Sequence, residues 1–555
     1  MKRIYFLILI ISAFALNGCE KSFLDKTSRS QFPGEFIETT EDGLELLITG
    51  TYHNMQSGNY YGGVLYLYEA LKGPDFFQRV TTGGYSFASE NAYSGGKNQT
   101  GNCPAAWTQI YNIVRNCTIL IESIDNVTGD ITHLRQLKAE AYALQALAYF
   151  DLLRLYSFPP RYSCPWGSAY NAKYKWGVPI IDTIDKGSNV LDYHTLIDEQ
   201  GVLVFRKDDV DALPAEDRAR INAAPDKVAQ GIGRNTAAEC WALVKDQMEK
   251  AQYMIKGIKS ENGKINEAAI LALRQRIALY MEDYVSAISL GEQWLAQFEN
   301  NYSMLNYDSW ESQYYKPFTS ESIWELKFSE VDNRGPGSIN YWARKQTYNI
   351  PGSPLDGKMS ENIGYAKMGL TFGTSSSGYE CLMAYPNDIR RYLICELGVP
   401  GTNWNSVRRY VGEPFHYVHN IPILRLPEIY LNLSEAYFKR GRVNEAIAML
   451  AKVTLARRKE ANPTITSINS ILDERRREFI FEGQTYFDWF RNGRNIPSRP
   501  LLGYISSTEG IDFATKVQVV YPIPLLEMNA NPAIRSQQNP GYGEWEFGIE
   551  DDDVL

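Results

Sequence analysis

The sequence predicts a mostly α-helical protein, in which amphipathic helical hairpins are joined by long irregular loops and a few short strands. Apolar residues recur at steps of three, four or seven positions in several long segments, which is the spacing of one helix face. Between these segments lie stretches rich in Gly, Ser, Asn, Pro and Tyr. The chain has 555 residues, of which 44% are apolar, so it can bury a sizeable core and is neither disordered nor fibrous.

The first residues of the chain are typical of a secretory signal. Lys2 and Arg3 precede the apolar run 4–16, whose only clearly polar member is Ser12. This run is shorter than the ~20 residues that a membrane-spanning helix needs, so we expect export rather than a membrane span. The alternative is that the run belongs to an ordinary signal peptide without further modification.

Cys19 follows this run closely. Leu16-Asn17-Gly18-Cys19 resembles a bacterial lipobox, in which the Cys thiol is acylated and becomes the mature N-terminus. We therefore expect residues 1–18 to be a lipoprotein signal peptide, Cys19 to be the lipidation site, and residues 19–31 to be a polar tether. Acyl chains stabilise membrane attachment by ~0.8 kcal/mol per buried methylene, so the lipid is the expected membrane anchor.

Charge and cysteine usage exclude several classes of protein. Lys and Arg total 56 and Asp and Glu total 65, a formal net charge of −9, which disfavours nucleic acid as a partner. The Cys residues form no C-x-x-C pair, so a zinc module is not indicated. Export would allow a disulfide between Cys103 and Cys117, but spacing leaves free thiols as an equal alternative.

The expected helices follow the domain start near Phe32. Apolar positions from Leu134 to Leu155 indicate one long helix that ends before Pro159-Pro160. A further helix is expected over 236–256. Two helical hairpins, each with a central turn, are expected over 268–298 and 429–459.

The two hairpins resemble copies of one repeat. An offset of 159 positions aligns Leu279 with Phe438 and Ala287 with Ala446. This resembles a degenerate tetratricopeptide repeat, which would make the scaffold an α-solenoid. Gly441 is expected in the turn of the second copy, where a positive φ would cost little for glycine. Unrelated helical hairpins are the alternative.

Charged residues near the C-terminus form a distinctive pattern. Glu474, Glu478 and Glu482 are spaced by four, so on a helix they repel one another unless arginines offset them. We expect a structural ion network that includes Arg491 or Arg494. Gly483 is expected to stop this helix. The proline-rich segment 521–542 is expected to be a fixed extended strap.

These motifs resemble the SusD/RagB family of outer-membrane nutrient-binding lipoproteins over essentially the whole mature chain. The resemblance also has two departures: Gln484-Thr485 replaces a basic residue often found there, and the loop 157–176 is longer than usual. The segments that carry the resemblance are Cys19 with Phe23-Leu24-Asp25, Trp107 to Asn116, Ala139 to Tyr156, Leu426-Pro427-Glu428 to Glu435-Ala436, the Glu474 motif, and Asn539-Pro540-Gly541-Tyr542.

The resemblance implies a tetratricopeptide-like scaffold that forms a single SusD-like domain over 32–555, with an N-terminal part at about 32–235 and a C-terminal part at about 236–555. It also implies a lipid-anchored protein on the outer face of the outer membrane, which partners a SusC-like TonB-dependent transporter. Members bind rather than catalyse, so the expected ligand is an oligosaccharide, with a peptide, as in RagB-type uptake, as the alternative. A freestanding repeat scaffold and a glycoside hydrolase are the remaining alternatives.

Aromatic rings in the irregular stretches 57–104 and 300–424 are the candidate ligand contacts, because ring faces can cover sugar rings. Flanking glycines in the first stretch and the irregular sequence of the second favour exposure of these rings. Loop packing is the alternative for each ring. The candidates are Tyr85, Phe87, Tyr93, Trp310, Tyr314, Tyr315, Tyr341 and Trp342. A third cluster, Tyr162, Trp166, Tyr170, Tyr174 and Trp176, is either a ligand contact or the contact with the transporter. Trp107 and Tyr111 lie in helix-like sequence and are assigned to the core.

No catalytic motif accompanies these rings. The G-x-S-x-G, H-E-x-x-H, G-x-x-x-x-G-K-[ST] and G-x-G-x-x-G signatures are absent, so no catalytic residue is assigned. His416 and His419 are the only close histidine pair, and prolines around them favour a loop over a metal site. The acidic tail 550–553 is a candidate calcium site, with solvation as the alternative, and no other cofactor is expected.

Overall fold

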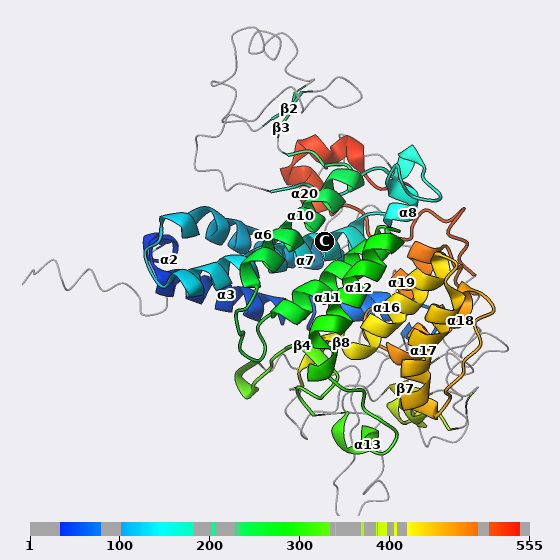
Figure 1. Cartoon of the computed structure of the whole chain (residues 1–555). Helices are drawn as coiled ribbons and strands as arrows, with labels where there is room; N and C mark the ends of the chain where they lie inside the picture. Colours follow the sequence, from blue (N-terminus) through cyan, green and yellow to red (C-terminus); the bar gives the residue numbers. More distant parts are fainter. Residues whose placement is uncertain are drawn as a thin grey trace, which may run out of the picture.

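The computed structural model describes residues 34–78, 102–181, 203–205, 228–230, 232–314, 316–332, 339, 368–370, 385, 387–396, 405–407, 419–497 and 510–543. Most of these residues are helical, and the helices form one continuous stack (Figure 1). The predicted fold class, a mostly α-helical scaffold with few short strands, is confirmed. Within the described ranges, no helix combines the length and the apolar composition that crossing a bilayer would require.

The N-terminal part of the stack contains seven α-helices among the described residues. They are α2 (Gly34–Thr39), α3 (Glu41–Met55), α4 (Val64–Lys72), α6 (Asn102–Ser123), α7 (Ile131–Tyr156), α8 (Pro160–Ser163) and α10 (Ala237–Ile255). The Asp130 carboxylate caps α7 by accepting the backbone N–H groups of Thr132 and His133. This helix ends three residues before Pro159, as the sequence predicts.

The C-terminal part begins with the two predicted hairpins. The described helices here are α11 (Glu267–Tyr280), α12 (Tyr284–Phe298), α13 (Trp310–Gln313), α16 (Leu426–Lys439), α17 (Val443–Arg458), α18 (Ile468–Glu478), α19 (Thr485–Asn492) and α20 (Leu525–Ala530). Helices α3, α6, α7, α10, α11, α12, α16 and α17 each contact the next one in this order. Such a chain of neighbouring contacts is an α-solenoid.

The two hairpins meet where α12 crosses α16. Gly291 permits this close approach, because a Cβ at that position would lie 2.6 Å from Leu433 Cδ2. In the second hairpin Gly441 adopts φ +76° in the turn, as predicted. In the first hairpin the position offset by 159 is Glu282, which adopts φ +59°. The repeat therefore requires a left-handed residue at this turn, and one copy meets the requirement without glycine.

The described strands form three small sheets. Strands β4 (Ser322–Leu326) and β8 (Ile421–Arg425) pair antiparallel, with Ser322 opposite Arg425 and Leu326 opposite Ile421. A second sheet has the antiparallel order β1 (Phe76–Gln78), β5 (Met368–Leu370), β7 (Asn405–Val407), β6 (Ile394–Glu396), and a third pairs β2 (Leu203–Phe205) with β3 (Val228–Gln230) in parallel. The described 3-10 turns are η2 (Ile124–Asn126), η3 (Ala172–Tyr174), η7 (Glu299–Asn301), η8 (Glu330–Asp332), η10 (Ile389–Leu393) and η11 (Pro532–Gln537).

One expectation about the C-terminal end of the fold needs correction. The C-terminal strap is not extended throughout, because it contains α20 and η11. The strap is nevertheless fixed, since the Asn539 amide donates to the carbonyl oxygens of Tyr156 (2.7 Å) and Tyr521 (2.8 Å).

A disulfide between Cys103 and Cys117 is excluded, because both lie on α6, 14 residues or about 21 Å apart along its axis, and both are buried free thiols.

The assignment of Trp107 and Tyr111 to the core is confirmed. Trp107 is 4% exposed, and its ring lies 4.8 Å from the Tyr111 ring and 4.9 Å from the Tyr156 ring. Tyr111 is partly buried and donates its hydroxyl to the Pro179 carbonyl at 2.8 Å. These rings therefore join α6 to α7 and to the segment that follows α8.

Candidate functional site

The segment 305–321 contains two of the rings that the sequence assigned to a ligand face. Trp310 begins α13 and Tyr314 follows it, and the two rings stack with centroids 4.2 Å apart. Trp310 is 2% exposed and Tyr314 is 8% exposed. The expectation that these two rings face solvent is therefore wrong. The physical reason is that each ring packs on the other, and a buried arginine packs on Trp310.

The exposure predicted for the other six candidate rings is not tested by the structure. Tyr85, Phe87, Tyr93, Tyr315, Tyr341 and Trp342 lie outside the described residues. The proposed lipidation site, Cys19, also lies outside them, as do His416 and the acidic tail 550–553. These assignments remain predictions from the sequence.

Arg457 of α17 holds the segment 305–321 at three points. Its guanidinium lies 4.4 Å from the centre of the Trp310 ring, within cation–π distance. It donates to the Leu305 carbonyl at 2.5 Å and pairs with the Glu321 carboxylate at 2.6 Å. The same Glu321 oxygen accepts the Leu305 backbone N–H at 2.7 Å. One arginine thus fixes both ends of the segment and the ring between them.

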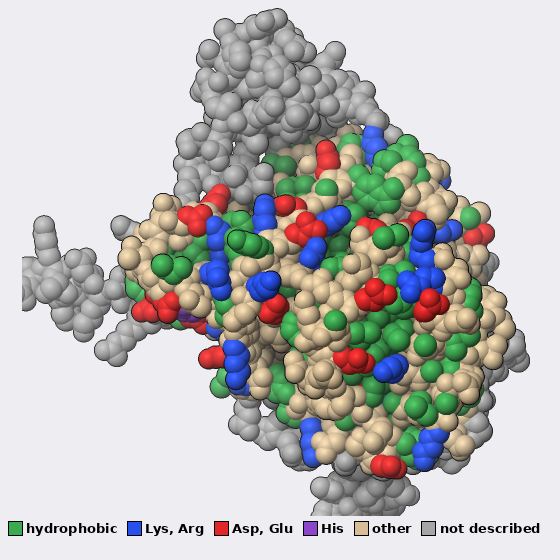
Figure 2. All heavy atoms as spheres, viewed as in Figure 1, with side chains coloured by type: hydrophobic (Ala, Val, Ile, Leu, Met, Phe, Trp, Pro, Cys, Tyr) green, Lys and Arg blue, Asp and Glu red, His purple; other side chains and the backbone are tan. Residues whose placement is uncertain are grey.

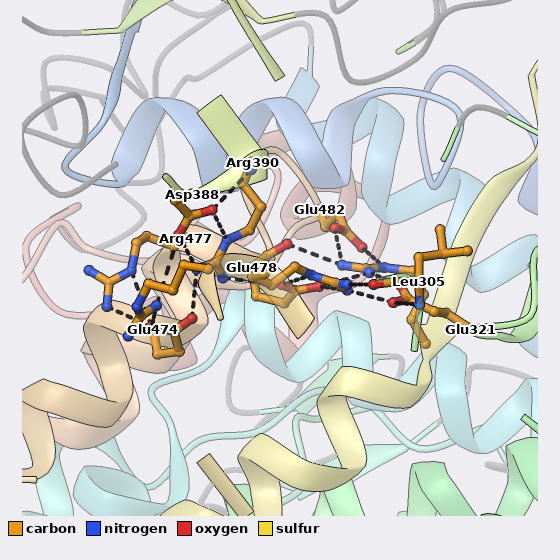
Figure 3. Close-up of polar contacts among 11 residues, drawn as sticks. Leu305, Glu321, Asp388, Arg390, Glu474, Arg477, Glu478 and Glu482 are labelled. Atoms are coloured by element: carbon orange, nitrogen blue, oxygen red, sulfur yellow. Dashed lines mark hydrogen bonds and ion pairs between the residues drawn. The ribbon is translucent and has the colours of Figure 1, made fainter. Parts of the chain in front are cut away.

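Arg457 belongs to a buried ion network around α18 (Figure 3). The prediction that arginines offset Glu474, Glu478 and Glu482 is confirmed. The network consists of the carboxylates of Glu321, Asp388, Glu474, Glu478 and Glu482 and the guanidinium groups of Arg390, Arg425, Arg457, Arg458 and Arg477. Among the described residues these five buried carboxylates face five buried guanidinium groups, and Arg458 also pairs with the partly exposed Glu460. Such pairing offsets the cost of burying the charges.

Glu478 is at the centre of this network. Its carboxylate accepts from Arg425 at 2.9 Å, from Arg457 at 2.8 and 2.9 Å, and from Arg390 at 3.1 Å. Burial alone would raise the pKa of Glu478, but the charges of Arg457 and Arg425 outweigh it and lower the pKa to about 2. Burial likewise raises the pKa of Glu474, but the charges of Arg390, Arg477 and Arg458 outweigh it and lower the pKa well below its ordinary range. Both groups are carboxylates at neutral pH.

The network also holds the place where the chain returns from residues 333–384. Arg390 in η10 pairs with Asp388 at 2.5 Å and with Glu474 at 2.7 Å. The Tyr385 ring lies against Arg458 and Arg477, with 4.0 and 5.0 Å to its centroid. Tyr385, Asp388 and Arg390 were not identified from the sequence, because they precede α18 by about 80 residues and no local spacing connects them with it.

Two details of the C-terminal motif differ from expectation. Arg491 pairs with Glu435 and Asp488, and Arg494 pairs with Asp473, so neither contributes to the Glu474 to Glu482 row. Helix α18 ends at Glu478, before Gly483. The glycine adopts φ +73° in the turn that leads to α19. The motif is therefore a helix followed by a tight turn, rather than one helix stopped by glycine.

The chemistry available in the network is structural. General acid catalysis needs a carboxyl group whose pKa is raised toward the operating pH, whereas Glu474 and Glu478 have lowered values and are bonded to arginines. Among the residues that the structure describes, no group of three or more His, Cys, Asp or Glu side chains is arranged to hold a metal ion. The His419 Nδ1 lies 2.5 Å from the Asn420 carbonyl oxygen.

A cavity of about 450 Å³ lies between α6 and α20. Its volume is within the about 300 to 1,000 Å³ of small-molecule sites. The lining residues include Trp107, Tyr111, Arg115, Glu527 and Asn531. Glu527 accepts the Trp107 indole N–H at 3.2 Å, so the polar wall of the cavity is joined to the core.

The third aromatic cluster, in the loop 157–176, contains both buried and exposed rings. Tyr162 is 9% exposed and Tyr174 is 6% exposed, and the Tyr174 ring stacks on Phe158 at 3.9 Å. Trp166 and Tyr170 are 47% and 42% exposed. Two rings therefore anchor the loop while two others face solvent. Figure 2 shows hydrophobic side chains gathered on the surface over α8, from which this loop emerges.

The described part of the chain is thus an α-solenoid whose long segments are tied to the helices by buried ion pairs. Comparison with known proteins defines this class further. The model of the SusD family matches residues 298–542. A second model, described as starch-binding associating with outer membrane, matches residues 22–279. The chain belongs to the SusD family.

Individual relatives support this assignment over most of the chain. SusD-like protein P38 of Formosa agariphila is 22% identical, over 96% of this chain and 98% of its own length. The starch-binding protein SusD of Bacteroides thetaiotaomicron is 30% identical over 25% of each chain. A solved SusD superfamily structure from Bacteroides thetaiotaomicron has a TM-score of 0.70 at 22% identity, covering 90% of this chain and 100% of that one. A laminarin-binding SusD-like protein has a TM-score of 0.61 at 18% identity, covering 91% and 100%.

Proposed function

We propose that this chain is a non-catalytic glycan-binding lipoprotein of the outer membrane, which captures oligosaccharides at the cell surface and passes them to a SusC-type TonB-dependent transporter. The observation that carries the proposal is the match of two SusD-type family models over 22–279 and 298–542. Starch and laminarin are what two relatives are named for binding, so neutral glucans are the first ligands to test.

The architecture is consistent with binding without catalysis. The carboxylates around α18 are held as anions by arginines and tie down loop segments, so they supply no proton donor. Trp310 and Tyr314 are buried, and their role in this proposal is to support the segment 305–321 rather than to touch the ligand. Tyr85, Phe87, Tyr93, Tyr315, Tyr341 and Trp342 remain the candidate sugar contacts.

Calorimetric titration of the mature chain tests the ligand class. The panel is maltoheptaose, laminarihexaose and a mixed peptide pool. Two or three rings that each cover ~100 Å² of sugar surface give roughly 5 to 8 kcal/mol, and association costs at least ~4 kcal/mol, so affinities of about micromolar to millimolar are expected. Binding of the peptide pool alone, or cleavage of any panel member, would contradict the proposal.

Ring variants test the site. The triple variant Tyr85→Ala, Tyr341→Ala, Trp342→Ala should lose measurable binding of the best glycan. The matched control is Tyr253→Ala, which removes a ring that is 83% exposed on α10. Unchanged affinity in the triple variant would remove these rings from the site.

The partner and the anchor have separate tests. A stable complex buries ~1,200 to 2,000 Å² or more, so purification in mild detergent should retain a transporter-sized companion. Cys19→Ala should give an exported protein that no longer fractionates with membranes in a strain without the transporter. Recovery of the wild-type protein alone contradicts the partnership, and membrane retention of the variant contradicts lipid anchoring.

A further inference from the structure

The loop 157–176 presents two aromatic rings to solvent in a fixed position. Trp166 and Tyr170 are 47% and 42% exposed, although large rings are normally buried. Both lie between α8 and η3, in a part of the loop whose backbone is internally bonded: Ala169 N–H donates to the Arg161 carbonyl at 2.9 Å, and Asn171 N–H to the Tyr162 carbonyl at 2.9 Å. The rings are therefore exposed on an ordered turn.

Residues of the turn between α11 and α12 hold this loop from outside. The Trp166 indole N–H donates to the Met281 carbonyl at 3.1 Å. The Glu282 carboxylate accepts the Ser168 backbone N–H and the Ser168 hydroxyl, both at 2.9 Å. Arg161 donates to the same hydroxyl at 2.6 Å. The indole edge of Trp166 is thus fixed. Ser168, which is held by two hydrogen bonds to Glu282, lies two residues before Tyr170 and fixes the backbone next to it.

Glu282 has an unusual backbone for this task. It adopts φ +59°, which side chains with a Cβ rarely do, at the position where the second hairpin has Gly441 at φ +76°. Glycine would relieve this conformation but would remove the carboxylate that binds Ser168. The chain therefore has a strained glutamate at a position from which its carboxylate binds Ser168 of the loop.

The charge around the rings is positive. Residues 157–176 contain Arg161, Lys173 and Lys175 and no Asp or Glu, in a chain whose net charge is −9. Glu282 offsets Arg161, to which it lies at 3.4 Å. Lys173 is exposed, its ammonium lies 4.5 Å from the Tyr174 ring centre, and no described carboxylate is within 4.0 Å of it. Lys173 follows Tyr170 by three residues, so it is the cation available to an anionic group on a sugar that covers Tyr170.

We propose that Trp166, Tyr170 and Lys173 form a second oligosaccharide-binding surface, which takes sugar chains that carry carboxylate or sulfate groups. The exposed ring faces cover the C–H faces of pyranose units, and Lys173 pairs with the anionic substituent. This inference rests on the proposed function, because it assumes that glycans reach the protein, but it uses none of the ring candidates near 85–93 or 341–342.

Titration of the mature wild-type chain with hexagalacturonate and with maltohexaose tests the surface. Each ring that covers ~100 Å² of sugar contributes about tenfold or more in affinity. We expect Trp166→Ala and Tyr170→Ala each to weaken hexagalacturonate binding about tenfold. Lys173→Gln should weaken it and remove most of its salt dependence. Tyr253→Ala, which removes an exposed ring elsewhere, should leave the affinity unchanged.

A fourth variant separates positioning from contact. Glu282→Gly keeps the left-handed turn but frees Ser168, so it should weaken hexagalacturonate binding while the thermal midpoint stays at or above that of the wild type.

The outcomes distinguish this surface from the proposed function. If the wild type binds glycans and the Trp166→Ala, Tyr170→Ala double variant binds them equally well, the second surface is wrong while glycan capture stands. If the wild type binds no oligosaccharide, both fail. Equal affinity for hexagalacturonate and maltohexaose overturns the anionic preference. Loss of the co-purifying transporter in the double variant, with glycan affinity intact, identifies the rings as a protein contact instead.

Discussion

Two buried glutamates of this protein differ in charge at neutral pH: one is ionised and the other is protonated. Glu478 on α18 is 0% exposed and Glu69 on α4 is 2% exposed. Burial raises the pKa of each, but Arg457 and Arg425 reverse the effect at Glu478 and lower its pKa to about 2. Glu69 accepts the Tyr486 backbone N–H at 3.1 Å and has no described cation within ion-pair distance, and burial raises its pKa to about 8. Charge is therefore set by the partners and not by accessibility.

The difference explains what each region can do. The α18 network stays ionised over the physiological pH range, so its hold on the segments near Leu305 and Asp388 does not depend on pH there. Glu69 carries a proton at neutral pH in the folded protein but is ionised in the unfolded chain, so folding requires that Glu69 bind a proton. The two regions thus contribute to stability in opposite pH windows, and the predictions below test this in order of decreasing effect.

The largest effect is expected from Glu478→Gln. Removing the charge leaves Arg425 and Arg457 buried without full compensation, and breaking a buried ion pair costs about 3 to 5 kcal/mol. Urea unfolding at pH 7 measures the loss. Because the folded pKa of Glu478 is lowered from 4.5 to about 2, its contribution is fully present above about 4.5 and is lost as pH falls toward 2. The wild type should approach the variant across that window, and a constant difference would contradict the lowered pKa.

The next effect has the opposite sign and comes from Glu69→Gln. The folded pKa is raised from 4.5 to about 8, so the wild type loses stability as pH rises through this range. Each pKa unit corresponds to about 1.4 kcal/mol. Because Gln accepts the Tyr486 N–H less strongly than a carboxylate does, part of this gain is lost, and we expect the variant to be about 1 to 3 kcal/mol more stable at pH 8. At pH 4.5 the two proteins should be nearly equal. A variant that is less stable at both pH values would show that Glu69 is ionised.

A smaller effect is expected at His133 on α7, which binds two carboxylates of α3 in a partly exposed site. Its Nδ1 lies 2.6 Å from Glu41 and its Nε2 lies 3.0 Å from Glu45. Burial lowers the pKa of His133, but the hydrogen bonds to Glu41 and Glu45 outweigh it and raise the pKa. Its contribution is therefore present below about 6.5 and is lost as pH rises through the raised value.

His133→Gln should accordingly reduce the free energy of unfolding at pH 5.5 by less than about 1 kcal/mol, because solvent screens the pair. At pH 9 the variant and the wild type should unfold at nearly the same urea concentration. If the variant and the wild type differed more in unfolding free energy at pH 9 than at pH 5.5, the raised pKa of His133 would be contradicted.

The smallest effect is expected at the exposed pair Arg442 and Glu445, whose charged atoms lie 2.9 Å apart. Solvent screens this pair, and exposed pairs contribute little. Glu445→Gln should leave the urea midpoint indistinguishable from that of the wild type at 0.15 M salt. A shift comparable with that of Glu478→Gln would break the contrast between buried and exposed carboxylates.

The helices were predictable because their information is local. The apolar spacing of 134–155 and the prolines at 159 and 160 located α7 to within three residues at its start and one at its end. The same apolar spacing located both hairpins, and Gly441 marked the turn of the second one. The same local reasoning failed for the strap, because proline pattern alone does not exclude the short α20.

The candidate site was less predictable because exposure is not a local property. Trp310 and Tyr314 occur in glycine-poor but irregular sequence, which resembled an exposed loop. Trp310 packs against Arg457, which lies more than 140 positions away in the sequence, and Tyr314 stacks on Trp310. Similarly, nothing local distinguishes Trp166 from Tyr162, although one ring is exposed and the other packs near Phe490.

The sequence by itself determined the helical scaffold and the need for arginines beside Glu474, Glu478 and Glu482, since these follow from periodicity, spacing and charge, and its motifs indicated the family by resemblance. The tertiary structure alone decided which arginines meet those carboxylates, which rings are exposed and which buried carboxyl group keeps its proton. The physical reason is that desolvation and ion pairing depend on distances between segments that only the folded chain brings together.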